Sequence, residues 1–165
     1  SPGPLYLYFK NKDELYASLS LRILQYLIIR LEHVNGNHEL NSIQKVEALI
    51  EAMFDVYEFD PLIIINMAHL QSSETLKNLS DELLGEIEAL SRKSLGAIAR
   101  IFQEGIDQGL FVDEHPVALA DIFWSMFSGV ILWESSKSII NDNKNYLKET
   151  LKIAFEIFAR GLRKA

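Results

Sequence analysis

The sequence contains no cysteine among its 165 residues. Structural disulfides, thiolate metal sites and cysteine nucleophiles are therefore excluded. A chain without cysteine is compatible with a reducing compartment, and its first residues do not have the pattern of a secretion signal. We therefore expect a cytoplasmic protein.

Positive charge is also scarce. The chain has 16 lysine and arginine residues against 23 aspartate and glutamate residues, which gives a formal net charge of −7. A free-standing DNA-binding domain needs a basic face, because neutralising phosphates supplies most of its non-specific affinity. The acidic balance instead suits a soluble regulatory or catalytic body. If the protein binds DNA, we expect most of the basic surface to lie in another part of it.

Long hydrophobic runs are few. The longest nearly uncharged stretch covers residues 116–133, and Asp121 interrupts it. A membrane-spanning helix needs about 20 mostly apolar residues. The stretch is short and charged for that role, so it predicts a buried helix, and no membrane is expected as a partner.

Strand patterns are lacking as well, because no segment alternates apolar and polar residues between turn signals. The chain has only four prolines, and each stands where a helix can begin. Apolar residues instead recur every three or four positions, which is typical of amphipathic helices. The sequence predicts an all-α bundle of about seven helices, over residues 1–9, 11–34, 42–59, 60–70, 80–109, 116–136 and 146–162, with a loop at 71–74.

Helix ends carry recognisable signals. Asn11 can cap a helix, and Glu14 follows it at the spacing of a capping box. Ser80 can cap the long helix that follows it. Glycine at the end of a helix favours a left-handed turn, which we expect at Gly36. The long helix that Ser80 caps is expected to stop at Gly109.

The first sixteen residues carry a specific motif. The run Tyr6-x-Tyr8-Phe9 is followed almost without a gap by Asn11-Lys12-Asp13-Glu14-Leu15. This pattern resembles the TetR family of transcriptional regulators, where a helix-turn-helix recognition helix ends in such an aromatic run. Weaker similarities follow in the expected order, in residues 102–111 and 158–162. The resemblance therefore covers the whole chain, tightly at first and loosely afterwards.

The resemblance implies two parts. Residues 1–11 would be the end of a helix-turn-helix domain, most of which this sequence lacks, and residues 12–165 a TetR-like ligand-binding and dimerisation domain. Tyrosine hydroxyls and lysines at the exit of a recognition helix can bond phosphate oxygens. The expected contacts to operator DNA in the intact protein are Ser1, Pro2, Gly3, Tyr6, Tyr8, Lys10 and Lys12. The alternative is an aromatic core cluster beside a capped helix.

A regulatory bundle should hold a pocket for an unknown small-molecule effector. Polar or soft residues inside apolar stretches are the candidates, because such pockets combine apolar walls with a few oriented polar groups. The expected ligand-binding residues are Tyr57, Asn66, Met67, His69, Phe102, Trp124 and Phe127. For Met67, Phe102 and Phe127, ordinary core packing is the alternative. For Asn66 and His69 it is a hydrogen bond to the backbone.

The helix predicted from Pro116 is apolar nearly all round, so it must be covered on every side. The resemblance implies a homodimer built on the last two helices. The expected interface residues are Ile122, Phe123, Met126, Val130, Phe155, Phe158 and Leu162. The alternative is a monomer whose central helix is fully buried.

Motifs of catalysis are absent, including a phosphate-binding glycine loop, a nucleophile elbow and a His-Glu-x-x-His helix. His33 and His38 flank a predicted loop, but they lack the further ligands that a metal site needs. We therefore expect no enzyme, no cofactor and no metal. The sequence predicts a ligand-responsive DNA-binding regulator, a repressor, whose effector acts through the helix Lys12–Val34. The alternative is a small helical enzyme, or a bundle that binds a lipid or another small molecule.

Overall fold

The computed structural model describes residues 9–72, 74–143 and 145–165, which form six α-helices and one 3-10 helix. In chain order these are α1 (Lys12–Gly36), α2 (Ser42–Phe59), α3 (Pro61–Ser72), the 3-10 helix η2 (Glu74–Asn78), α4 (Asp81–Asp107), α5 (Pro116–Ile140) and α6 (Leu147–Leu162). The predicted all-α class is confirmed. The helix expected over residues 1–9 lies, except for Phe9, outside the described residues.

The helix starts follow the capping signals in the sequence. The Asn11 side chain accepts a hydrogen bond from the Glu14 backbone N–H at 2.9 Å. The Glu14 carboxylate accepts one from the Lys10 N–H at 3.0 Å, one residue before the position that a capping box uses. Ser80 caps α4 by accepting from the Leu83 N–H at 3.3 Å. Capping satisfies amides that a helix cannot pair internally, so it sets where each helix begins.

Two predicted boundaries and one predicted turn were wrong. Residues 71 and 72 belong to α3, and η2 follows at Glu74, so the loop expected at 71–74 is mostly helical. Helix α1 continues through Gly36 and ends at Asn37 in an extended conformation, whereas Gly109 does take a left-handed φ of 71°. Helix α5 runs to Ile140, four residues past the expected end at Ser136.

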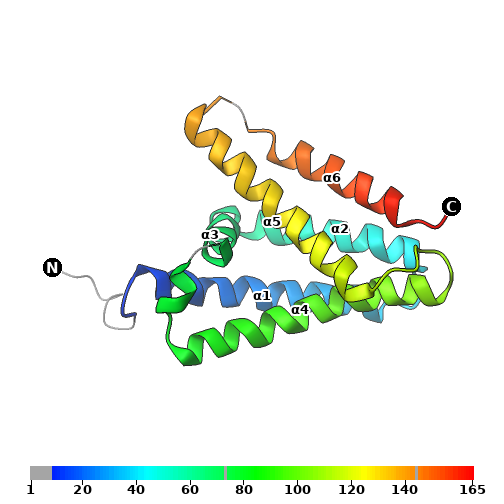
Figure 1. Ribbon diagram of the computed structural model, residues 1–165, viewed down its shortest axis with the longest axis horizontal. Helices are drawn as coiled ribbons and strands as arrows, with labels where there is room; N and C mark the ends of the chain where they lie inside the picture. Colours follow the sequence, from blue (N-terminus) through cyan, green and yellow to red (C-terminus); the bar gives the residue numbers. More distant parts are fainter. Residues whose placement is uncertain (1–8, 73, 144) are drawn as a thin grey trace.

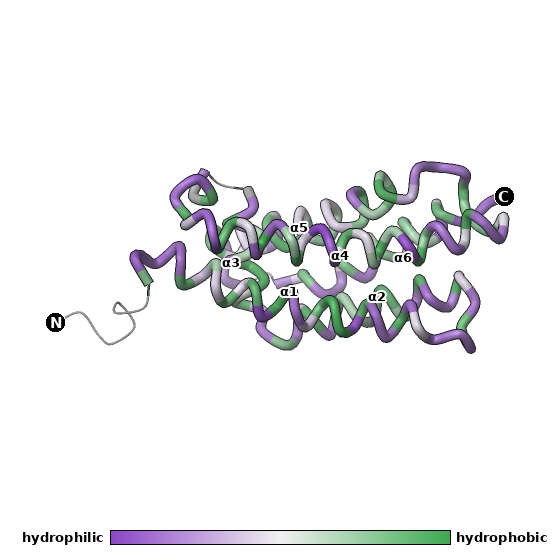
Figure 2. Tube along the Cα trace, turned by 90° about the horizontal axis from the view of Figure 1, so that it is seen from below, coloured by the Kyte–Doolittle hydropathy of each residue, from purple (hydrophilic) through white to green (hydrophobic). Residues whose placement is uncertain are grey.

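The helices form a bundle in which α1 and α4 lie side by side (Figure 1). Helix α2 returns beside α1, α3 lies across the bundle near one end, and α5 crosses over α4 before α6 runs back beside it. Hydrophobic and hydrophilic segments alternate along the helices (Figure 2), as expected of amphipathic helices around a common core.

A column of aromatic rings fills the centre of this core. The ring centroids of Phe123 and Phe155 lie 5.1 Å apart, and those of Phe123 and Phe158 lie 5.4 Å apart. Phe102 continues the column on α4, and Phe127 continues it on α5. Ring pairs at these separations stabilise a core beyond the area that they bury.

A smaller hydrophobic cluster lies apart from this core, beside the first turns of α1. It consists of Ala17 on α1, Leu70 on α3 and Leu79 after η2, with residues from the start of α4 packed against them. Helix α1 therefore contacts the small cluster with one end and the main core with the rest of its length.

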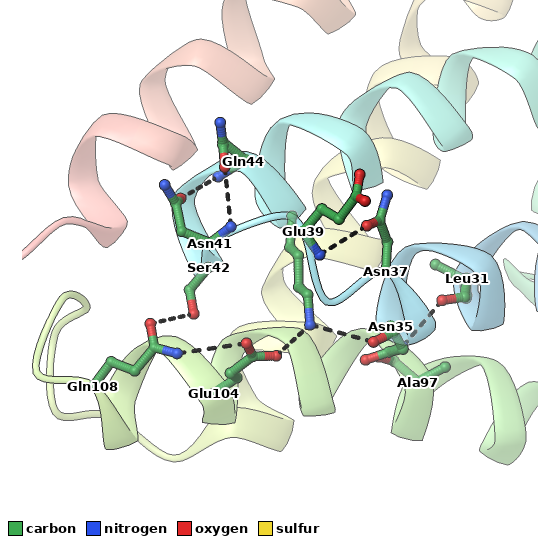
Figure 3. A network of polar contacts seen from close by, with 11 residues as sticks. Leu31, Asn35, Asn37, Glu39, Asn41, Ser42, Gln44, Ala97, Glu104 and Gln108 are labelled. Carbon is green, nitrogen blue, oxygen red and sulfur yellow. Dashed lines mark hydrogen bonds and ion pairs between the residues drawn. The ribbon is translucent and has the colours of Figure 1, made fainter.

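The end of α6 is held to the turn after α4. The Val112 N–H donates to the Leu162 carbonyl at 2.9 Å, and the Lys164 N–H donates to the Leu110 carbonyl at 2.9 Å. At the same end of the bundle, a buried lysine on α2, Lys45, donates hydrogen bonds to Asn35 on α1 and Glu104 on α4. Figure 3 labels these two partners.

Candidate functional site

A cavity of about 330 Å³ lies between α1, α3, α4 and α5. This volume falls at the lower end of the range of small-molecule pockets. Its apolar lining comes from Leu24 on α1, Leu95 and Ile98 on α4, and Trp124 on α5. Its polar lining consists of Gln71, Glu88, Ser91, Arg92, Ser94 and Asp121.

Helix α4 supplies six of these ten residues because its spacing places them on one face. Glu88, Ser91, Leu95 and Ile98 follow each other at intervals of three or four residues, so they form a single stripe along the helix. The Ser94 hydroxyl donates to the Leu90 carbonyl of the same helix at 2.9 Å. The long, capped α4 therefore forms one wall of the cavity, with its polar residues towards the start of the helix.

A hydrogen bond joins the two helices on the opposite side. The Trp124 indole N–H donates to the Gln71 side-chain oxygen at 3.3 Å. The indole ring therefore borders the cavity while its only donor is satisfied by α3. This bond couples α3 to α5 at the edge of the cavity.

The charges of the cavity are unequally paired. Arg92 forms an ion pair with Glu88 one turn earlier on α4. Asp121 has no hydrogen-bond or ion-pair partner in the part of the chain that the structure describes. Because Asp121 and Trp124 are three residues apart on a helix, they are neighbours on its surface.

The seven predicted ligand-binding residues do not lie together in the structure. Trp124 lines the cavity, whereas the other six lie elsewhere in the described structure. Met67, Phe102 and Phe127 are buried in the main core, which was the alternative expected for them. Asn66 bonds the Leu62 carbonyl of its own helix at 2.8 Å.

His69 and Tyr57 also lie away from the cavity. The His69 side chain is exposed on α3. Tyr57 is buried near the end of α2, and burial raises its pKa above the usual 10.0, with Glu58 adding to the rise and Lys148 opposing it. The Lys148 ammonium donates to the Glu58 carboxylate at 2.6 Å, which raises the lysine pKa. This pair ties the start of α6 to the end of α2.

Sequence analysis missed nine of the cavity residues. Glu88, Ser91 and Arg92 are polar residues in the first half of α4, so they have the pattern of an ordinary solvated face, whereas Leu95 and Ile98 have the pattern of core residues. Gln71 fell in a segment predicted to be a loop. The available signal was the i, i+3, i+7 spacing on α4, but it does not indicate which helices stand opposite.

An outward apolar face runs along α5 and α6. Ile122 and Trp133 on α5 are 55% and 65% exposed, and Ile153 and Ile157 on α6 are 57% and 66% exposed. The side chains on α5 are eleven residues apart, which is three turns of one helical face. Single apolar residues are common on surfaces, but several large ones exposed on two neighbouring helices are a candidate interface.

The predicted dimer residues divide between this face and the core. Ile122 points outward, and Met126, Val130 and Phe158 are half-buried. Phe123, Phe155 and Leu162 are at most 2% exposed, so their side chains belong to the protomer's own core. Both sides of α5 are apolar, so periodicity alone did not separate the core side from the outer one.

The predicted DNA-binding residues lie at the start of the chain. Ser1, Pro2, Gly3, Tyr6 and Tyr8 are outside the described residues. The side chains of Lys10 and Lys12 are exposed next to the N-terminus of α1. The Lys12 ammonium lies 5.5 Å from the centre of the Tyr16 ring.

Within residues 9–72, 74–143 and 145–165, no group of three or more histidine and carboxylate side chains could hold a metal ion. Helix α5 is long and apolar enough to cross a membrane by length and composition alone. In the fold it packs against α3, α4 and α6, and it contributes five buried apolar residues to the main core.

No protein-family model matches this chain. The fatty acid metabolism regulator protein of Bacillus subtilis (strain 168) is 28% identical to it over 163 residues, which cover 97% of this chain and 78% of that protein.

Solved structures share its fold. The TetR-family transcriptional regulator PfmR from Thermus thermophilus superposes with a TM-score of 0.75 at 21% identity, covering 99% of this chain and 84% of that one. The regulator FadR from Bacillus subtilis, solved in complex with stearoyl-CoA, superposes with a TM-score of 0.66 at 21% identity, covering 97% of this chain and 81% of that one. The fold is therefore that of the TetR-family regulators, and these similar proteins are named as regulators rather than enzymes.

Proposed function

We propose that this chain, with its TetR-type fold, is the regulatory part of a dimeric cytoplasmic transcriptional repressor whose effector binds in the cavity between α1, α3, α4 and α5. Residues 1–11 would be the end of the helix-turn-helix unit, and residues 12–165 the ligand-binding and dimerisation domain. The proposal is supported by the aromatic motif at the start of the chain, by the shared fold and by the similarity to a fatty acid metabolism regulator.

One observation carries the proposal: α1, which directly follows the DNA-binding motif, also forms a wall of the cavity through Leu24. A ligand that fits the cavity best in one position of α1 stabilises that position. If operator DNA favours a different position, ligand and DNA weaken each other's binding by the same factor. This linkage makes α1 the coupling element.

The proposed dimer uses the outward face of α5 and α6. Two copies of this face, related by a two-fold axis, would form a four-helix interface that covers Ile122, Trp133, Ile153 and Ile157. Such an interface gives α5 the cover that its composition requires, because one side packs on the protomer's own core and the other on the partner.

The test measures operator affinity of the intact protein, with its complete helix-turn-helix, by fluorescence anisotropy. Operator DNA is first selected in vitro with the same protein. Added effector should weaken operator binding by about tenfold or more, which corresponds to a typical coupling energy. Acyl-CoA thioesters belong in the effector panel because of the stearoyl-CoA complex of FadR.

A matched pair of variants assigns the effect to the cavity. Leu95→Trp fills the cavity and should abolish the response while operator binding remains. Ile50→Trp places the same bulk in a groove between α2 and α6 and should keep the response. A ligand that binds the protein tightly but leaves operator affinity unchanged would contradict the proposal.

A further inference from the structure

We propose that the cavity between α1, α3, α4 and α5 selects an amphipathic cation: a molecule with a short apolar body and a positively charged head. This inference rests on the proposed function, because it takes this cavity as the effector site. It concerns the chemical class of the effector, which neither the fold nor the similar proteins determine for this chain.

The apolar body follows from the lining. Leu24, Leu95 and Ile98 are aliphatic, and the Trp124 ring provides a flat apolar surface beside them. An engineered cavity of about 150 Å³ lined by such side chains binds benzene. A volume of about 330 Å³ therefore has room for roughly twice that ligand, which corresponds to a chain of about ten carbon atoms or two small rings.

The positive head follows from the charges. Glu88 and Asp121 contribute two negative charges to the lining, and Arg92 contributes one positive charge that is already paired with Glu88. The unbalanced charge is the carboxylate of Asp121, a residue that lines the cavity and is exposed to solvent, so the lining has a formal charge of −1. A cation that enters with its apolar body first would meet this carboxylate, whereas a carboxylate or phosphate would be repelled by it.

Trp124 strengthens this selection. Its N–H is held by Gln71, so the face of the ring rather than its polar edge remains for a ligand. Aromatic faces attract cations within about 6 Å of the ring centre. Asp121 lies three residues earlier on the same helix, so a single cation can lie close to the carboxylate and the ring together.

Three probes with the same ten-carbon chain test the head group: decylammonium, decanol and decanoate, each well below the concentration at which it forms micelles. Trp124 reports binding by its fluorescence in a Trp133→Phe variant of this chain, because the sequence has only two tryptophans. Decylammonium should bind about tenfold tighter than decanoate at low salt, with decanol between them. The difference should shrink at about 1 M salt, where screening reaches within about 3 Å.

Asp121→Asn should bring the three affinities together, mainly by weakening decylammonium. Asp142→Asn removes the same charge from the exposed turn between α5 and α6, so it controls for the change in net charge and should leave the order unchanged. The inference is overturned if decanoate binds as tightly as decylammonium, if no probe binds, or if Asp121→Asn preserves the order.

Operator release by the intact protein separates this inference from the proposed function. Tight decylammonium binding without any change in operator affinity supports the ligand class and contradicts the regulatory role. Operator release by an anionic acyl ligand, through a cavity that prefers anions, overturns the ligand class and supports the regulatory role.

Discussion

The buried lysine at the end of the bundle provides a sharp test of the energetics. Lys45 is 3% exposed, and its ammonium donates to the Glu104 carboxylate at 2.7 Å and to the Asn35 carbonyl at 3.2 Å. Gln108 donates to the other oxygen of Glu104 at 3.5 Å and accepts from the Ser42 hydroxyl at 2.8 Å (Figure 3). These contacts join the ends of α1 and α4 to the start of α2.

The two partners of this ion pair differ in exposure, so their removal should have unequal costs. The Glu104 side chain is 35% exposed and can be hydrated when Lys45 is absent. The Lys45 ammonium is buried and cannot be hydrated, so Glu104→Gln leaves a buried charge without its counter-charge. Glu104→Gln should lower the free energy of unfolding by about 3 kcal/mol. Lys45→Met should lower it by about 1 kcal/mol, because mainly hydrogen bonds are lost.

The double variant Lys45→Met with Glu104→Met completes the cycle. Replacing both charges with apolar side chains removes the desolvation cost together with the attraction, so its stability should lie within about 1 kcal/mol of the natural chain. Urea unfolding followed by far-ultraviolet circular dichroism measures all four proteins at one fixed concentration, because a dimer's stability depends on concentration. Equal losses for the two single variants, or a double variant that loses the sum of both, would refute the reasoning.

Three further outcomes are expected. Gly105→Ala should lower the free energy of unfolding by about 2 kcal/mol, because the new methyl group would lie 2.0 Å from the phenyl ring of Phe111. Gly85→Ala is the matched control: its methyl group meets no atom within 4 Å, so it should raise the free energy of unfolding by up to about 1 kcal/mol. Urea unfolding measures both variants. The raised pKa of Tyr57 means that the folded protein keeps the phenol proton to a higher pH than the unfolded protein does. The free energy of unfolding therefore keeps this contribution below about pH 10 and loses it as the pH rises further. Tyr57→Phe should make that fall less steep in unfolding curves recorded at successive pH values. Ile122→Glu should dissociate the proposed dimer in native mass spectrometry, whereas Ile29→Glu, which changes an isoleucine on α1 that is even more exposed, should not. A dimer that survives Ile122→Glu contradicts the proposed interface.

The features of the fold that were predicted correctly depend mainly on local sequence signals. Asn11 and Ser80 cap the helices that they were expected to cap, since a cap depends on residues within one turn. Gly109 takes the left-handed conformation at the end of α4. Gly36 does not, because α1 continues through it and Asn37 ends the helix with an extended backbone instead.

The cavity could not be predicted, because its walls come from four helices that are distant in sequence. Leu24 has the pattern of a core residue, and Glu88 and Arg92 that of a solvated ion pair. Only the crossing of α5 over α4 places Trp124 opposite this stripe. From the sequence, polar, aromatic and methionine residues within apolar stretches were predicted to line the pocket. Two of these aromatic residues, Phe102 and Phe127, instead fill the centre of the bundle.

The position of α1 connects these observations. Its residue Ala17 belongs to the small cluster with Leu70 and Leu79, whereas Leu24 and Leu31 belong to the main core, and Leu24 also lines the cavity. Close-packed cores resist compression, so we expect a ligand in the cavity to be accommodated by a movement of α1 rather than by deformation of the core. Lys45 and Asn35 hold the far end of α1 to α4. A shift at the cavity should therefore be larger at the N-terminal end of α1, next to the motif that resembles the end of a recognition helix.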